Sequence, residues 1–535
     1  MPSPQSIGTA LRAARRALRS GDSAGAERLF REVLTRFPGN RAAREGLRTV
    51  AGNPADKRAE ARRLLVSGAF GAAEPLWAEL ARQPEDAEAG LALAECRLGL
   101  GRPDDALNAV DRLLDACPAL PAALDLRGRC LRDLGRVTEA ANCHRAALGH
   151  GSADAGPLNH LGILALAQDD RPAAAAYFRQ ALVLAPASAD LHHNLSRAIT
   201  YHPGEPHLAD LRAQARRAGA DPAQAPLHFA LFRALDDLGE RDEAFGHLVT
   251  ANRLRKAWLG YDITRDIAVS GAVMKLCADL PPLPDEPPPG PRVIFVTGLP
   301  RSGTTLVERI LAGSPGVRPC GELSIVTTAA ARLLRETQAR GEGHVAPDVF
   351  RTFREEVRAG LHQRAEGQPI VVDKMPLNFR WLGLVLAALP EARAVHLHRN
   401  PMAVGWSLYR HMFGGRGNGF AHDVVDIAAF MRLAQEMTAA WSTRFEPRLL
   451  SLDYATLTSE PEQAIRRLIG DLGLDWSEDC LTPHHATGAV LTASAAQVRQ
   501  PIRPGHDTAW HAYAPQLRPL ATALTAAGLV QISPS

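Results

Sequence analysis

A repeat of 34 residues constrains the fold of the first half of this 535-residue chain. Ala106, Ala140 and Ala174 follow one another at this interval. The positions four residues later carry Val110, His144 and Phe178. A small side chain at a fixed position lets two antiparallel helices approach closely, and the later side chain fills the gap between them. The period therefore predicts a stack of helical hairpins that bury their apolar faces against one another.

The period and register resemble those of the tetratricopeptide repeat (TPR). Turn glycines at Gly101 and Gly135, and prolines at Pro118 and Pro186 that stop helices, recur where such repeats have them. Weaker copies surround Ala26, Ala73 and Ala244. The resemblance implies an α-solenoid over residues 1–279, whose groove would bind an extended or helical peptide.

Prolines crowd residues 280–291. Such a segment can neither pair in a sheet nor continue a helix, so it predicts a stiff linker. We place a second domain at 292–535 and expect it to fold and bind its ligand without the repeats.

Short apolar runs alternate with helical patterns after the linker. The runs cover residues 292–298, 370–372, 394–398 and 449–452. This rhythm predicts an α/β domain with a parallel sheet, and ligand sites at the carboxyl ends of its strands. The expected fold class is therefore α + α/β, with a TPR solenoid before a P-loop-like domain.

A glycine loop follows the first of these runs, with Gly298 and Gly303 in P-loop spacing before Thr304 and Thr305. The amides of such a loop and of the next helix N-terminus bind an oxyanion. In ATP- and GTP-binding loops a lysine precedes the Ser/Thr. Here Thr304 occupies that position, and Arg301 lies three residues earlier. The loop therefore favours a nucleotide other than ATP.

A second motif has Arg399 directly after the run 394–398 and Ser407 eight residues later. Arginine offers phosphate a planar fork of donors, and serine adds a neutral donor. The loop 300–305 and this motif together resemble the 5′-phosphosulfate and 3′-phosphate motifs of sulfotransferases. The resemblance implies the co-substrate 3′-phosphoadenosine 5′-phosphosulfate (PAPS) and no metal.

The resemblance also implies roles for single residues. Arg301 would hold the 5′-phosphate, and Arg399 and Ser407 the 3′-phosphate. The other loop residues expected at the 5′-phosphate are Ser302, Gly303, Thr304 and Thr305. Tyr454 matches a tyrosine near the adenosine, although a core tyrosine with a bonded hydroxyl fits the sequence equally well.

Two candidate catalytic residues lie in segments similar to those of tyrosylprotein sulfotransferases. Lys374 occupies the place of a lysine that would neutralise the bridging oxygen as the S–O bond breaks. Glu322 would remove the acceptor proton. Because the family's second glutamate is Leu323 here, Asp373 and His506 remain alternative bases.

A Ser-x-x-Gln-Val pattern near the C-terminus also resembles the family, and it places Ser494 three residues before Gln497. The resemblance implies that it donates to the leaving phosphate. The basic residue expected three positions after the glutamine is Gln500 here, and we expect the neighbouring Arg499 to contact the nucleotide instead.

Composition excludes several classes of protein. The net charge of +3, from 61 basic and 58 acidic residues, gives no general attraction for nucleic acid. Seven cysteines without a C-x-x-C pair argue against a zinc site or a disulfide framework, and favour a reducing, cytoplasmic location. No apolar run reaches the ~18 residues that span a bilayer.

The sequence thus predicts a sulfotransferase that moves a sulfuryl group from PAPS to an acceptor hydroxyl. A protein tyrosine recruited by the repeats is the favoured acceptor, with small-molecule, glycan and lipid acceptors left open. Two alternatives are a P-loop kinase or NTPase, and a TPR scaffold with an inactive nucleotide-binding domain.

Overall fold

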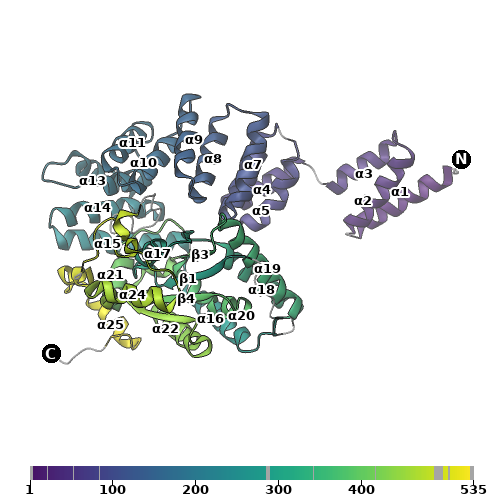
Figure 1. Cartoon of the computed structure of the whole chain (residues 1–535). Helices are drawn as coiled ribbons and strands as arrows, with labels where there is room; N and C mark the ends of the chain where they lie inside the picture. The colour runs from purple at the N-terminus through teal and green to yellow at the C-terminus, as the bar shows by residue number, and fades with distance from the viewer. Residues whose placement is uncertain are drawn as a thin grey trace. The chain divides into compact units, whose positions relative to one another are not determined.

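The computed structural model describes residues 4–20, 22–51, 54–83, 85–284, 290–341, 343–415, 417–486, 498–503 and 506–530. The chain divides into two compact units, Met1–Ser152 and Ala153–Ser535. Figure 1 labels many of their helices and strands. Helices of the first unit are α1 (Pro4–Arg19), α2 (Ser23–Arg36), α3 (Arg41–Ala51), α4 (Pro54–Val66), α5 (Phe70–Leu80), α6 (Ala87–Gly99), α7 (Pro103–Ala116), α8 (Pro121–Asp133) and α9 (Val137–Gly149).

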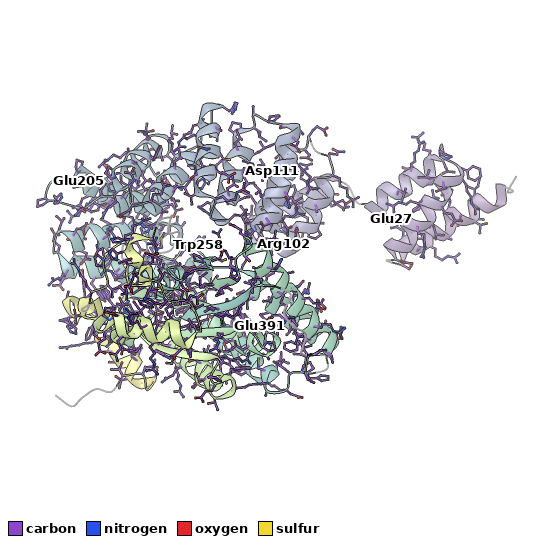
Figure 2. All side chains as sticks on the ribbon, viewed as in Figure 1. Glu27, Arg102, Asp111, Glu205, Trp258 and Glu391 are labelled. Atoms are coloured by element: carbon purple, nitrogen blue, oxygen red, sulfur yellow. The ribbon has the colours of Figure 1, made fainter. Side chains whose placement is uncertain are left out.

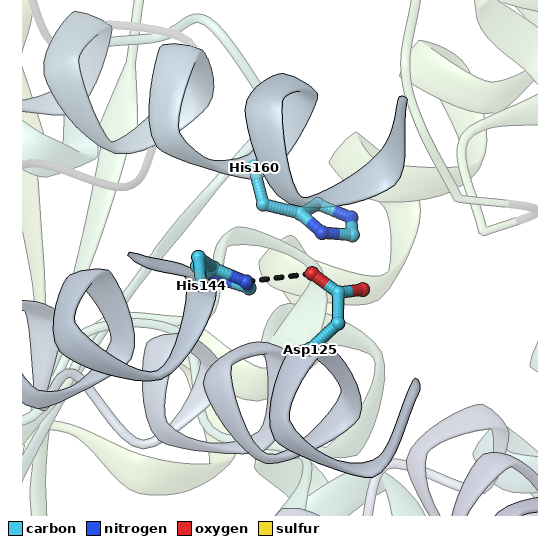
Figure 3. Close-up of side chains that lie close together, drawn as sticks. All are labelled: Asp125, His144 and His160. Carbon is cyan, nitrogen blue, oxygen red and sulfur yellow. Dashed lines mark hydrogen bonds and ion pairs between the residues drawn. The ribbon is translucent and has the colours of Figure 1, made fainter. Parts of the chain in front are cut away.

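Helix pairs in the first unit pack as the repeat predicts. Ala106, Val110, Ala140 and His144 are all fully buried. A Cβ on Gly128 of α8 would lie 2.5 Å from the His144 ring of α9, so only glycine lets these helices approach closely. Nδ1 of His144 lies 2.7 Å from Oδ1 of Asp125 (Figure 3). The predicted small-residue and gap-filling positions are therefore confirmed.

The second unit begins with helices that lie in the region predicted to hold the repeats. They are α10 (Gly156–Ala167), α11 (Arg171–Leu184), α12 (Ala189–Ala198), α13 (Pro206–Ala218), η1 (Pro222–Gln224), α14 (Ala225–Asp237), α15 (Arg241–Leu259) and α16 (Ile263–Ala278). Ala174 and Phe178 are fully buried, as the repeat predicts. A Cβ on Gly162 would lie 2.4 Å from the Phe178 ring, which repeats the pairing of a glycine with a large side chain.

A five-stranded parallel sheet follows, in the order β2-β3-β1-β4-β5, which confirms the predicted α/β fold. The strands are β1 (Arg292–Gly298), β2 (Val317–Pro319), β3 (Ile370–Asp373), β4 (Arg393–His398) and β5 (Leu449–Asp453). The remaining helices are α17 (Thr304–Ala312), α18 (Ile325–Arg340), α19 (Pro347–Arg364), η2 (Pro376–Trp381), α20 (Leu382–Ala388), α21 (Pro401–Tyr409), η3 (Gly419–His422), α22 (Val424–Phe445), α23 (Tyr454–Ser459), α24 (Pro461–Asp471), η4 (Glu478–Leu481), η5 (Pro483–His485), η6 (His506–Tyr513) and α25 (Arg518–Ala526).

Both faces of the sheet are covered, and side chains fill the space on each side (Figure 2). Phe295 of β1 belongs to one core together with helices α18–α22 and α25. Its neighbour Val296 belongs to the other core, with α17 and α24. Successive strand residues point to opposite faces, so a continuous apolar run is what a strand buried on both sides requires. None of the helices in the described ranges is long and apolar enough to cross a membrane.

Helices α14–α16 share the core of the half that contains the sheet. Phe229 and Phe232 of α14, and Val273 and Cys277 of α16, lie in one hydrophobic cluster with Phe295 of the sheet. The division between compact units therefore falls after Ser152 and not at the proline-rich segment 280–291. Prolines show where secondary structure stops, but they do not show where packing stops.

This packing predicts how truncated chains behave. A fragment that starts at Pro287 should fail to fold, because it loses every apolar side chain that α14–α16 bury against the rest of the unit. Each large buried side chain contributes ~1.5–3 kcal/mol, and their sum is comparable with the ~5–15 kcal/mol that stabilises a domain. A fragment from Ala153 onward should melt cooperatively in circular dichroism. Cooperative melting of the shorter fragment near the same temperature would contradict the shared core.

Candidate functional site

The glycine loop connects β1 to α17 through a backbone that few residues tolerate. Gly303, the N-cap of α17, has a φ of 109°. A Cβ there would lie 2.7 Å from the ring of Tyr454, so the position requires glycine for its conformation and for its contact. Arg301 adopts a φ of 72°, which is uncommon for a residue with a side chain. The result is a tight loop that places the N-terminus of α17 beside the carboxyl end of β1.

Loop residues divide between the cavity and the protein interior. Arg301, Gly303 and Thr305 line a cavity of about 440 Å³. Ser302 and Thr304 are buried, with 1% and 4% of their surfaces exposed, and they are not among its lining residues. The Ser302 hydroxyl has no hydrogen-bond partner among the described residues. Three of the five loop residues predicted to contact the donor therefore face the cavity.

The two predicted anion motifs meet directly. Arg399 follows β4, and Ser407 lies on α21, whose first turn is capped by Asn400. Arg301 Nε donates to Ser407 Oγ at 3.0 Å, and Arg399 Nη1 donates to the Arg301 carbonyl at 2.9 Å. Arg301 thus turns toward the motif predicted for the 3′-phosphate.

Arg399 has two further partners. Its Nε donates to Asp507 Oδ1 at 2.6 Å, and its guanidinium lies 4.3 Å from the centre of the Tyr454 ring. Tyr454 is 8% exposed and lines the cavity, and burial raises its pKa. No motif in the sequence indicated Asp507, because the pairing joins positions 108 residues apart.

Positive charge accumulates around this cavity. Burial, followed by the charges of Arg399 and Arg410, lowers the pKa of Arg301 to about 10. An arginine stays protonated at that value, so Arg301 presents a positive charge at the cavity. The part of the chain before the sheet adds one carboxylate and three arginines to the lining, and its lining residues are Leu166, Asp169, Arg171, His193, Arg197, Phe229, Phe232 and Arg233. The geometry suits an anionic ligand with an apolar portion.

The predicted catalytic pair forms a second group. Lys374 Nζ lies 2.6 Å from Glu322 Oε1. The Lys374 side chain is fully buried and that of Glu322 is 43% exposed, so the carboxylate is the accessible partner. Glu308 of α17 accepts from the Gly321 amide at 2.7 Å and fixes the segment that carries Glu322. Neither Lys374 nor Glu322 lines the cavity.

Of the two alternative bases, Asp373 is buried away from solvent, and the side chain of His506 is not among the described residues. Asp373 is fully buried and accepts from Asn378 Nδ2 at 3.0 Å. Burial raises the pKa of Asp373 to about 8, so its carboxyl is mostly protonated at neutral pH. The side chain of His506 lies outside the described residues.

Of the described residues near the C-terminus, some line the cavity and others do not. Arg499 Nη2 donates to the Ala167 carbonyl at 2.7 Å, at the end of α10, and Arg499 is not among the cavity-lining residues. Gln500 and Arg503 do line the cavity. Ser494 lies outside the described residues.

Comparison with known proteins agrees with this architecture. Residues 291–478 match the model of the sulfotransferase family, and residues 11–47, 58–121 and 97–157 match the tetratricopeptide repeat. The chain contains a sulfotransferase-family domain preceded by tetratricopeptide repeats.

Three similar proteins differ in sequence identity to this chain and in how much of it they cover. An uncharacterized protein of Aquifex aeolicus (strain VF5) is 32% identical over 315 residues, which cover 56% of this chain and 41% of that protein. A putative protein-tyrosine sulfotransferase of Caenorhabditis briggsae is 27% identical over 241 residues, 41% of this chain and 80% of the relative. The sulfotransferase domain of the Synechococcus PCC 7002 olefin synthase is 22% identical, with a TM-score of 0.32, over 44% of this chain and 91% of that domain.

Proposed function

We propose that this protein transfers a sulfuryl group from PAPS to an acceptor hydroxyl. The observation that carries the proposal is the meeting of two anion motifs in one cavity, with Arg301 bonded to Ser407 and Arg399 bonded to the Arg301 backbone. Such an arrangement suits a nucleotide with phosphates at two positions. Tyr454 lines the same cavity, and its ring supports the Arg399 guanidinium beside the nucleotide.

The Lys374–Glu322 pair supports the chemical step. The acceptor oxygen attacks sulfur, the bond from sulfur to the bridging oxygen breaks, and 3′-phosphoadenosine 5′-phosphate leaves with the electron pair. Glu322 takes the acceptor proton, and Lys374 stabilises the charge on the departing oxygen. The 2.6 Å contact between these side chains keeps the cation beside the base before the donor binds.

A polypeptide hydroxyl, with tyrosine first, is the proposed acceptor. Relatives named protein-tyrosine sulfotransferases in Caenorhabditis briggsae and Drosophila melanogaster support this choice. The chain spans about two-fifths of the length of the Aquifex aeolicus relative, and 80% and 40% of these two. Tetratricopeptide repeats, which commonly bind peptides, give the acceptor a second site of contact.

A transfer assay tests the proposal. The full-length protein is incubated with tyrosine peptides and a simple phenol, and with either sulfuryl-labelled PAPS or γ-labelled ATP. We expect label from PAPS on an acceptor and none from ATP. Transfer of the ATP γ-phosphate would favour the kinase alternative.

Chelation gives a separate prediction. We expect turnover to survive excess EDTA within about twofold, because Arg301, Arg399 and Lys374 supply the cations that Mg²⁺ supplies in phosphoryl transfer. The measurement is the rate with EDTA compared with the rate in added Mg²⁺. Complete inactivation that Mg²⁺ reverses would contradict this account of the charge balance.

A further inference from the structure

Repeat helices contribute cations to the same cavity as the sulfotransferase motifs. Arg197 lies near the end of α12, and Arg233 lies on α14. Both line the cavity together with Arg301 and Ser407. Two segments far apart in the chain thus direct guanidinium groups toward one space.

Within the described residues, neither Arg197 nor Arg233 makes hydrogen bonds or ion pairs like those of Arg171, Arg399 and Arg410. In the described part of the chain, Arg233 Nε is buried without a hydrogen-bond partner. Arg197 is solvent-exposed, yet burial and the charge of Arg233 lower its pKa. Both observations follow if the Arg197 side chain projects into a water-accessible cavity enclosed by protein. Asp237 offsets the charge of Arg233 only in part, because burial still lowers the pKa of Arg233.

Two other arginines that line the cavity have hydrogen-bond partners within the protein. Arg410 Nη2 donates to Asp236 Oδ2 at 3.0 Å. Arg171 donates to the carbonyls of Ala198 and Ile199, at 3.3 and 3.1 Å, and so ends α12. Against this background, Arg197 and Arg233 are cations in position for a ligand anion. Arg233 Nε is buried, and a bound anion would supply the acceptor that this donor lacks among the described residues.

The position of the cavity indicates which anion this is. Arg399 and Ser407, the motif expected at the 3′-phosphate, line the cavity, whereas Lys374 and Glu322 do not. Arg399 is already paired with Asp507, so a phosphate beside it needs further positive charge. The loop residues Arg301, Gly303 and Thr305 also line the cavity, so it would hold the nucleotide from its 5′-phosphate to its 3′-phosphate, and the acceptor beside Lys374 and Glu322 would lie outside it.

We propose that Arg197 and Arg233 bind the 3′-phosphate end of the donor nucleotide, so that repeat helices α12 and α14 complete the donor site. The inference rests on the proposed function. It gives the last repeats a role in binding the donor, beyond any contact of the repeats with an acceptor.

Calorimetry on full-length protein tests the inference with Arg197→Gln and Arg233→Gln. Each substitution should weaken binding of 3′-phosphoadenosine 5′-phosphate about 10–100-fold, the effect of losing one charge-assisted hydrogen bond. Affinity for adenosine 5′-phosphate should change less than about threefold. Arg212→Gln is the matched control, since Arg212 is an arginine of α13 that pairs with Glu243 and does not line the cavity.

Hydrogen exchange on the unmodified protein covers the case in which a variant does not fold. We expect 3′-phosphoadenosine 5′-phosphate, and not adenosine 5′-phosphate, to slow exchange in α12 and α14. Absence of that protection, or wild-type affinity in both variants, overturns the inference. If the wild type itself does not distinguish the two nucleotides, the proposed function fails. If Arg399→Ala removes the distinction but neither repeat variant does, this inference alone fails.

Discussion

Arg399→Ala should abolish the preference for a 3′-phosphorylated nucleotide, with a loss of about 10²–10³-fold in affinity. Arg399 donates to Asp507 at 2.6 Å. Its removal takes away a phosphate ligand and also leaves the Asp507 carboxylate facing the anion. A buried charge that loses its partner costs more than the hydrogen bond itself. The measurement is calorimetric titration with 3′-phosphoadenosine 5′-phosphate and adenosine 5′-phosphate.

The control is the double variant Arg399→Ala, Asp507→Asn. It should recover part of the lost affinity, because the amide removes the unpaired negative charge. A melting temperature far below that of the wild type in Arg399→Ala would instead identify Arg399 as a structural residue.

Glu322→Gln should lower turnover about 10²–10⁴-fold, the usual contribution of general base catalysis. Glutamine keeps the shape and can still accept a hydrogen bond from Lys374, so the buried lysine is not left without a partner. Donor affinity should stay within a few-fold of wild type, since Glu322 does not line the cavity. Initial rates at saturating donor, together with calorimetry, separate the two effects.

Glu366→Gln is the matched control, because Glu366 pairs with Arg318 at the exposed edge of the same sheet. We expect its turnover to equal that of wild type. Near-normal turnover in Glu322→Gln would show that another group takes the proton.

Features with a short-range signal could be predicted from the sequence. The 34-residue interval between Ala140 and Ala174 predicted the helix pairs, because the same close approach recurs between α8 and α9 and between α10 and α11. The glycine loop and the apolar run 292–298 predicted a strand, a turn and a helix in order. Conformations set by neighbouring residues leave a pattern in the chain itself.

Features that depend on packing between distant segments left no such pattern. Asp507 pairs with Arg399 because η6, which carries Asp507, packs against α21, the helix that follows Arg399. In the sequence, nothing distinguishes Arg197 and Arg233 from the other arginines of the repeat region. They line the cavity because of how α12 and α14 pack in the second unit. The core shared by α14–α16 and the sheet likewise depends on contacts that a proline-rich segment does not reveal.

The most direct test of the central claim is the difference in affinity of the full-length protein for two nucleotides. Calorimetry compares 3′-phosphoadenosine 5′-phosphate with adenosine 5′-phosphate at the same pH and salt. We predict tighter binding of the 3′-phosphorylated nucleotide by about 10²-fold or more, since Arg399 and Ser407 line the cavity and Arg301 donates to Ser407. Equal affinity for the two nucleotides would contradict it.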